Sequence, residues 1–263
     1  MERTVQDIID TIVAGVTDTP FPDTVDTLKT GDPNQKVTAI ATTLMATHEA
    51  IEQAIELGAN LIITHEPTFY NHLDETDWLK DDPVYRAKRQ LIDEHNIAIW
   101  RFHDYLHSIK PDPTFVGLLH ALGWTDYASP EQPFVCQMPS RALGDLVLEI
   151  KSKLGVGSVR VVGDMQMTCQ TVGVLVGAPG GRMQIETLGG LSLDVLVCGE
   201  INEWETSEYV RDAPAAGFPQ ALIVIGHSVS EEDGMREVVP WLQARLPELP
   251  VTFVPSGHAL RSI

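Results

Sequence analysis

Hydrophobic and polar positions alternate along the first half of the chain in a way that predicts strands and helices in turn. Short apolar, β-branched runs predict strands at 37–44, 60–65 and 97–102, and amphipathic stretches between them predict helices at 48–58 and 83–96. Thr47 supplies an N-cap for the first helix, and Pro83 suits the first position of the second. Strand–helix–strand–helix–strand order predicts a mainly parallel α/β sheet.

A similar pattern returns after the polar connector at 125–133, "TDYASPEQP". Further strands are predicted at 134–138, 158–163, 171–177, 191–200, 221–228 and 251–255, and helices at 140–155, 202–213 and 231–246. The glycines of "APGGRM" (178–183) predict a tight turn, and they lack the GxGxxG spacing or P-loop lysine of a nucleotide cradle. We therefore predict two α/β domains, 1–125, completed by the C-terminal segment near 220–263, and 126–219.

Composition narrows the classes of function that fit this fold. The 263 residues carry a net charge of −19 without a local basic patch, which argues against a nucleic-acid partner. The three widely spaced cysteines do not suggest a disulfide framework or a thiolate zinc site. The N-terminal residues do not resemble a signal peptide, and no apolar run approaches membrane-spanning length. We expect a soluble cytoplasmic protein without a membrane partner.

Candidate chemistry gathers where predicted strands end. The residues concerned are His65, Glu66, His103, Asp104 and His107, and further along the chain His227 and Glu231. Carboxyl ends of parallel strands share one edge of a sheet, which is where α/β proteins bind ligands. His103 and His107, like His227 and Glu231, are four residues apart, so each pair shares one face if the segment is helical.

Nitrogen and oxygen donors without a nearby thiolate suit Zn²⁺, Mn²⁺ or Fe²⁺ better than a structural thiolate site. The set is large enough for one or two ions, which could activate a water for hydrolysis. Taken singly, a histidine at a strand end is more often an ordinary loop residue. Three such clusters at equivalent topological positions favour the metal hypothesis.

Several motifs, in order, resemble those of the NIF-three-like family, whose members are often named GTP cyclohydrolase 1 type 2 homologs. They are "AIELGANLIITHEPTFY", "HDYLH", "VGVLVGAPGG", "LDVLVCGEI" and "GHSVSEEDGM". The resemblance covers nearly the whole chain. It implies two α/β lobes with mixed, largely parallel sheets around a metal cavity, and a homohexamer built as a trimer of dimers.

The dinuclear metal ligands of the family transfer onto five positions. The first histidine falls on His65, and the second falls on Glu66, where the family motif usually reads THHP. The family aspartate falls on His107, and the closing pair falls unchanged on His227 and Glu231. Glutamate replaces histidine at one position and histidine replaces aspartate at another, so the ligand types are exchanged, and the identity and number of the ions stay open.

The same resemblance gives roles to neighbouring groups. His103 matches another family histidine, and with Asp104 it is a candidate to orient ligands or face a substrate. Glu66 or Glu231 could act as general base if only one ion binds. Glu200, at the end of "VLVCGE", could face the metal cavity or be an acid that stabilises a helix N-terminus, and we favour the second interpretation.

The resulting functional hypothesis is a metal-dependent hydrolase acting on a small molecule through a metal-activated water. The alternative is a non-catalytic module that binds or stores metal or serves as an adaptor. The cyclohydrolase name implies opening of the GTP ring, but no feature of the sequence indicates recognition of guanine. The sequence identifies neither the substrate nor the reaction.

Overall fold

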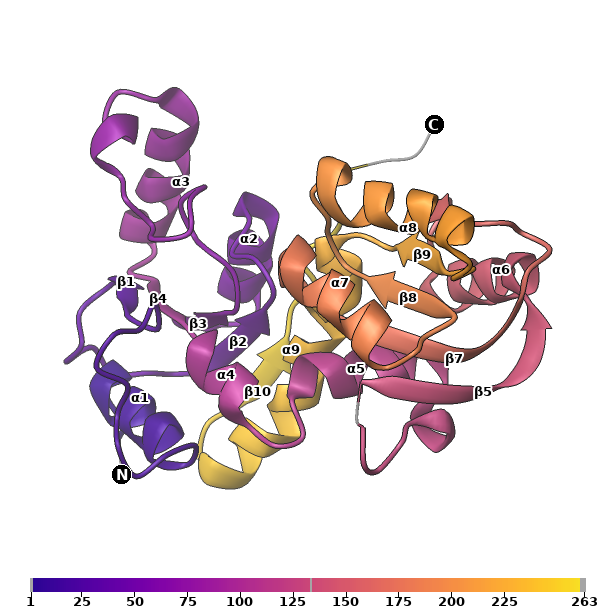
Figure 1. Ribbon diagram of the computed structural model, residues 1–263. Helices are drawn as coiled ribbons and strands as arrows, with labels where there is room; N and C mark the ends of the chain where they lie inside the picture. Colours follow the sequence, from indigo (N-terminus) through magenta and orange to yellow (C-terminus); the bar gives the residue numbers. More distant parts are fainter. Residues whose placement is uncertain (1, 133, 261–263) are drawn as a thin grey trace. The chain divides into compact units, whose positions relative to one another are not determined.

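The computed structural model describes residues 2–132 and 134–260 and confirms an α/β fold with two mixed five-stranded sheets (Figure 1). The chain forms two compact units. The first joins the segment up to Pro113 to Met235–Gly257, and the second contains Thr114–Gly234. The division predicted from the sequence, into 1–125 completed by the segment near 220–263 and 126–219, stays a prediction.

The sheet of the first unit has the strand order β1-β4-β3-β2-β10. Its strands are β1 (Leu28–Thr30), β2 (Ile40–Thr43), β3 (Leu61–Thr64), β4 (Ala98–Arg101) and β10 (Val251–Phe253). Strands β10, β2, β3 and β4 are parallel, and only β1 pairs antiparallel, with β4. The predicted parallel core of three strands is therefore confirmed, with β1 as an edge strand that the sequence pattern did not indicate.

Both faces of this sheet are covered by helices. On one face Leu61 and Ile63 of β3 join a core with α1 (Val5–Ala14) and the C-terminal part of α9 (His227–Arg245). On the other face Ile62 packs with α2 (His48–Glu56) and α3 (Pro83–Glu94). Successive side chains of a strand point to opposite faces of the sheet, so β3 packs against helices on both sides. Each buried Leu or Ile stabilises the fold by about 1.5–3 kcal/mol.

The helix starts follow the expected capping chemistry. The Thr47 side chain accepts a hydrogen bond from the N–H of Ala50 at the start of α2, as predicted, and Pro83 is the first residue of α3. The sequence analysis did not identify α1, although Thr4 and Asp7 form a capping box there. Short helix α4 (Asp104–Ser108) follows β4 directly.

The second sheet has the order β5-β7-β8-β9-β6. Its strands are β5 (Val135–Ala142), β6 (Arg160–Val162), β7 (Thr168–Leu175), β8 (Val195–Cys198) and β9 (Ala221–Val224). Strands β7, β8 and β9 are parallel, and the edge strands β5 and β6 are antiparallel to their neighbours. Within the second unit, α5 (Pro113–Leu122) and α6 (Leu143–Leu154) contribute to one core, and α7 (Gly181–Gly190) and α8 (Glu208–Asp212) to another.

Three local predictions in this unit were incomplete or wrong. The segment predicted as a turn at 178–183 does turn at Gly180, which has φ +86°, but residues 181–183 already belong to α7, a helix that the sequence analysis did not predict. The helix predicted at 202–213 is divided into a π-helical turn, Glu203–Ser207, and α8. Helix α9 begins at His227, four residues before the predicted start, so it follows β9 after only two residues.

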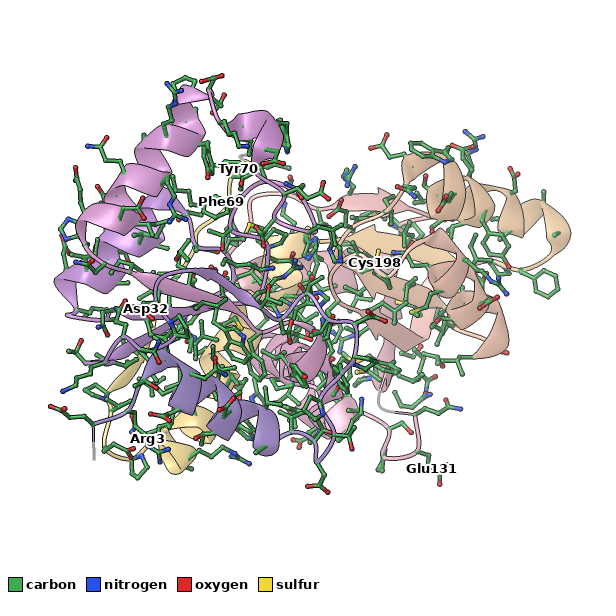
Figure 2. The ribbon with its side chains drawn as sticks, turned by 90° about the vertical axis from the view of Figure 1, so that its left-hand side faces the viewer. Arg3, Asp32, Phe69, Tyr70, Glu131 and Cys198 are labelled. Atoms are coloured by element: carbon green, nitrogen blue, oxygen red, sulfur yellow. The ribbon has the colours of Figure 1, made fainter. Side chains whose placement is uncertain are left out.

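The cysteines lie inside the second unit, where Figure 2 labels Cys198. Burial raises the pKa of Cys136 to about 11 and that of Cys198 to about 12, so these thiols stay protonated. Cys198 is therefore a core residue rather than a nucleophile. Within residues 2–132 and 134–260, no helix combines the length and the apolar character needed to cross a membrane.

Candidate metal centre

Three histidines from two strand ends meet in the first unit. His65 follows β3, His103 caps α4 and His107 lies in α4. The ring centroid of His65 lies 4.7 Å from that of His103 and 4.9 Å from that of His107. One ring nitrogen from each histidine can be chosen so that all three lie within 4.8 Å of one another. The structure therefore brings these three predicted residues into one cluster.

Each of the three rings has its Nδ1 beside an oxygen. The His65 Nδ1 lies 3.1 Å from the carbonyl oxygen of Phe102. The Nδ1 atoms of His103 and His107 each lie 2.8 Å from a carboxylate oxygen, of Asp104 and Asp112 respectively. Carbonyl and carboxylate oxygens accept hydrogen bonds, so each Nδ1 donates and Nε2 becomes the nitrogen that can bind a cation. Histidines that bind metals usually have this support.

A buried carboxylate sets the position of α4. Asp26 accepts hydrogen bonds from the backbone N–H groups of His103, Asp104 and Tyr105, at 2.8, 3.1 and 2.9 Å. Burial nevertheless raises the pKa of Asp26. These contacts fix the first turn of α4, which carries two of the three histidines.

Asp104 has the opposite electrostatic balance. Burial alone would raise its pKa, but hydrogen bonds from His103, Thr24 and the Val25 N–H outweigh this and lower the pKa. The Thr24 hydroxyl donates at 2.7 Å and the Val25 N–H at 3.1 Å. The charged carboxylate is thus stabilised where it holds the His103 ring.

Glu66 is the second predicted ligand on this loop, and it lies next to a buried cation. A carboxylate oxygen of Glu66 lies within 4.8 Å of a ring nitrogen of His65. The Arg101 guanidinium is fully buried, with one nitrogen 3.6 Å from the Glu66 carboxylate. Arg101 also donates to the carbonyl oxygens of His65, at 3.1 Å, and His72. It therefore anchors the loop and compensates the charge of Glu66.

The sequence analysis did not identify Arg101. Its signal is an arginine at the last position of an otherwise apolar strand, and β4 pairs Arg101 with Thr64, the residue before His65. A second buried cation, Lys88 of α3, donates to the Thr68 carbonyl at 2.6 Å and lies over the Phe69 and Tyr70 rings. Burial lowers the pKa of Lys88 to about 8.

The second unit holds the other predicted pair on the first turn of α9. His227 Nε2 lies 3.0 Å from a carboxylate oxygen of Glu231, and its Nδ1 lies 2.9 Å from the Glu200 carboxylate. Glu231 is only 3% exposed. The preferred interpretation of Glu200 as a helix N-terminal acid is incomplete, because its side chain contacts the imidazole of His227.

Two glycines allow this close packing. A Cβ on Gly177, which has φ +60°, would lie 2.3 Å from Glu231 Oε1. A Cβ on Gly199 would lie 2.5 Å from the Ser230 hydroxyl, which accepts a hydrogen bond from the Gly177 N–H at 2.9 Å. The backbone at Gly177, which follows β7, therefore packs against the start of α9. Glycine is needed there because a side chain would collide with the Glu231 carboxylate.

His72, a further histidine on the loop after β3, lies at the edge of the histidine cluster. Its ring lies 6.1 Å from that of His103, edge to face.

A sequence profile of the family described as Duf34/NIF3 (NGG1p interacting factor 3) matches residues 24–258. The chain belongs to the Duf34/NIF3 family. Among curated relatives, the GTP cyclohydrolase 1 type 2 homolog of Clostridium perfringens is 24% identical over 241 residues. The alignment covers 88% of this chain and 87% of the Clostridium protein. The Escherichia coli K12 protein of the same name is 23% identical over 227 residues, covering 84% and 85%.

Solved structures support the Duf34/NIF3 fold. The Staphylococcus aureus hypothetical protein SA1388 aligns over the full length of both chains with a TM-score of 0.76 and 20% identity. A Bacillus cereus protein related to NIF3 aligns over 100% of this chain and 99% of its own, with a TM-score of 0.77 and 16% identity. At these identities the likeness concerns the fold alone.

Proposed function

We propose that this Duf34/NIF3 protein binds a divalent metal ion and that His65, His103 and His107 hold it in the first unit. The observation that carries the proposal is the convergence of the three rings. One nitrogen of each ring lies within 4.8 Å of the others, and the oxygen beside every Nδ1 orients Nε2 as the nitrogen that would bind the cation. This makes His103 a ligand instead of an orienting residue. Among Zn²⁺, Mn²⁺ and Fe²⁺, a set of imidazole nitrogens favours Zn²⁺ or Fe²⁺ over Mn²⁺.

The other ligands that the family resemblance implies are Glu66, His227 and Glu231. We propose them as further ligands in a total of one or two ions per chain. Glu66 lies beside His65, and the His227–Glu231 contact brings a nitrogen and a carboxylate oxygen together. Oxygen and nitrogen donors of this kind suit the same borderline cations. Glu200 would orient His227 through Nδ1, as Asp104 orients His103.

We further propose hydrolysis of a small molecule as the reaction. Three protein ligands leave a coordination position open, as in catalytic zinc sites. When bound, the ion supplies Lewis-acid chemistry and activates water. Glu66 and Glu231 are the proposed proton acceptors, and Arg101 would keep Glu66 oriented for that role.

The metal proposal is tested by elemental analysis of protein purified without chelator. We expect bound Zn or Fe, and we expect the His103→Ala, His107→Ala double variant to lose most of it. His95→Gln, at an exposed position on the C-cap of α3, is the control and should keep its metal. Metal content that is equal in all three proteins would contradict the proposal.

The hydrolase proposal is tested by a screen of nucleotides, phosphoesters and cyclic amides with added Zn²⁺, Mn²⁺ or Fe²⁺. GTP belongs in the screen because of the relatives' names. We expect turnover that disappears in the Glu66→Gln, Glu231→Gln double variant while the ion held by His65, His103 and His107 is retained. Full metal loading without turnover of any substrate would favour the non-catalytic role in metal binding, storage or as an adaptor.

Two further proposals concern assembly and location. The family resemblance implies assembly into a homohexamer, a trimer of dimers. The three widely spaced cysteines, which do not suggest a disulfide framework, favour a cytoplasmic location.

A further inference from the structure

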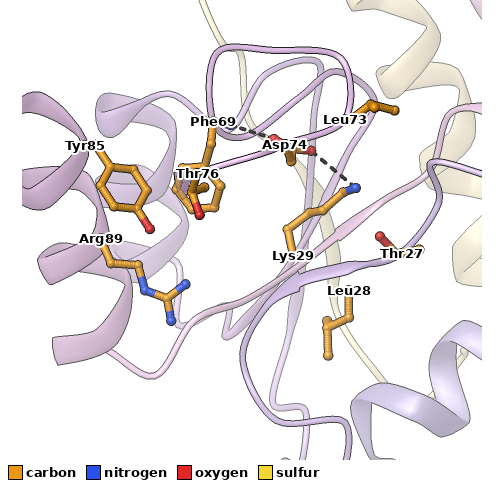
Figure 3. A pocket seen from close by; sticks show the side chains of 9 residues that line it. All are labelled: Thr27, Leu28, Lys29, Phe69, Leu73, Asp74, Thr76, Tyr85 and Arg89. Carbon is orange, nitrogen blue, oxygen red and sulfur yellow. Dashed lines mark hydrogen bonds and ion pairs between the residues drawn. The ribbon is translucent and has the colours of Figure 1, made fainter. Parts of the chain in front are cut away.

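A pocket of about 250 Å³ opens in the first unit between β1, the loop after β3, and α3 (Figure 3). Residues near β1 contribute Thr27, the loop contributes Thr76, and α3 contributes Tyr85 and Arg89. The pocket is smaller than the ~300–1,000 Å³ of sites for drug-sized ligands, so it suits a small metabolite. The described residues that line it include none of the proposed metal ligands, so it is a separate site.

The charged groups at this pocket are already paired within the protein. The Lys29 ammonium lies 3.3 Å from the Asp74 carboxylate, and both side chains are buried. Arg89 binds the Asp93 carboxylate through two of its nitrogens, at 2.9 and 3.0 Å. A charged ligand would lose water here without meeting an unmatched opposite charge, which is unfavourable. The pocket therefore favours a neutral molecule.

Three residues of the lining carry hydroxyl groups with unused hydrogen-bonding capacity. They are Thr27, Thr76 and Tyr85, and none of these hydroxyls bonds to another residue within 2–132 and 134–260. Each hydroxyl can donate one hydrogen bond and accept two. A ligand that donates and accepts at several positions fits them, and a molecule with several hydroxyl groups of its own has this property.

Arg89 adds donors to this set. Its side chain is 37% exposed, and its contact with Asp93 uses two of the five N–H groups of a guanidinium. The remaining N–H groups can donate to a ligand oxygen, and the Asp93 contact fixes the plane from which they do so.

The walls of the pocket are held in place by contacts within the protein. The Tyr85 ring meets the Phe69 ring edge to face, with centroids 5.3 Å apart. Thr76 follows Glu75, whose N–H and carbonyl oxygen both bond to the Asn71 side-chain amide, at 3.0 and 2.8 Å. Preorganisation of this kind reduces the entropy lost on binding.

We propose that this pocket binds a neutral, multiply hydroxylated ring, a monosaccharide or a cyclic polyol. The hydroxyls of Thr27, Thr76 and Tyr85 exchange hydrogen bonds with those of the ligand, and Arg89 donates to one of its oxygens. These groups come from different walls (Figure 3). A ring with hydroxyls around its edge reaches all of them at once, and its C–H groups pack on the Tyr85 ring and Leu73.

The proposal is tested by NMR titration of the backbone amide signals with D-glucose, D-ribose and myo-inositol. We expect saturable shifts with at least one of them, with Kd below about 10 mM and with the largest shifts at Thr76, Tyr85 and Arg89. The charged counterparts are D-glucuronate, D-ribose 5-phosphate and myo-inositol 1-phosphate. Each should bind severalfold more weakly than its neutral parent, because the pocket offers no unmatched charge.

A Thr76→Val, Tyr85→Phe double variant removes two hydroxyls and keeps the shape of the walls. It should weaken binding at least about tenfold, as the loss of two hydrogen bonds predicts. A Thr125→Val, Tyr127→Phe double variant makes the same chemical change in the second unit and should bind as the wild type does.

Three results would overturn the proposal. The first is the absence of saturable shifts with all three neutral ligands up to about 50 mM, which is weaker than an ordinary metabolite site. The second is a charged counterpart that binds more tightly than its neutral parent. The third is equal binding by the two double variants.

Discussion

The two units hold their candidate ligands by different means. In the first unit, the loop after β3 is anchored by buried cations, Arg101 and Lys88, that donate to backbone carbonyls. In the second, Glu231 is held next to His227 because Gly177 leaves space for its carboxylate. The first unit therefore depends on charge compensation and the second on close packing.

The two units also differ in the chemical groups that they offer to a metal ion. The first unit brings three imidazoles together, each with its own oxygen acceptor. The second offers one imidazole between two carboxylates, Glu200 and Glu231. A ring can donate from both nitrogens only as the imidazolium. A metal at His227 must therefore replace one of these contacts, whereas the histidines of the first unit keep theirs.

The largest effect is expected from Arg101→Met in the first unit. This change leaves the buried Glu66 carboxylate and two backbone carbonyls without their cation. Removing one partner of a buried ion pair costs about 3–5 kcal/mol, which urea unfolding should detect. The Arg101→Met, Glu66→Leu double variant is the control and should recover a large part of the loss. If the single variant is as stable as the wild type, charge compensation does not hold this loop.

The second prediction concerns the pH dependence of Lys88. Its pKa falls from 10.5 to about 8 in the folded protein, so the unfolded chain binds the proton more tightly between these pH values. The free energy of unfolding should therefore rise with pH from 8 to 10.5, by roughly 3 kcal/mol at about 1.4 kcal/mol per pKa unit. Below pH 8 the cost of the buried charge is present in full.

Lys88→Met isolates this effect, because other groups titrate equally in both proteins. The difference in unfolding free energy between wild type and variant should change over pH 8–10.5 and stay level from pH 6 to 7. A constant difference across the whole range would mean that Lys88 keeps an ordinary pKa.

The smallest effect should come from Gly177→Ala in the second unit. The new methyl group would force Glu231 away from its position, and the positive φ adds strain of about 1–2 kcal/mol. Gly155→Ala is the matched control, with φ +65° and open space around the added Cβ. Both variants should lose stability in thermal unfolding, but only Gly177→Ala should also reduce the metal retained by the protein. Equal behaviour would show that packing against Glu231 has no role.

Much of the fold could be predicted from the sequence because local pattern and tertiary structure agree. The runs at 37–44, 60–65 and 97–102 contain β2, β3 and β4, and Thr47 and Pro83 mark helix starts. Helix α7 was missed because Gly180 and Gly181 favour turns in isolation, and only packing of residues such as Leu188 selects a helix.

The candidate site was less predictable. Strand ends indicated the histidines, because parallel strands bring their carboxyl ends together. The oxygen acceptors depend on tertiary contacts, as with Glu200, which is 27 residues from His227. Glutamate at position 66, where the family usually has histidine, suggested an exchange of ligand types. In the structure, the Arg101 guanidinium compensates part of the charge of Glu66, a contact that the sequence did not indicate.

The buried cysteines have a practical consequence. All three are at most 1% exposed, and burial raises the pKa of each thiol, so mild maleimide labelling should leave them untouched. New cysteines at exposed positions, such as Glu94 in the first unit and Glu131 in the second, can then carry probes in an otherwise wild-type chain. Distances between such probes would report directly on how the two units are arranged in solution, with and without metal.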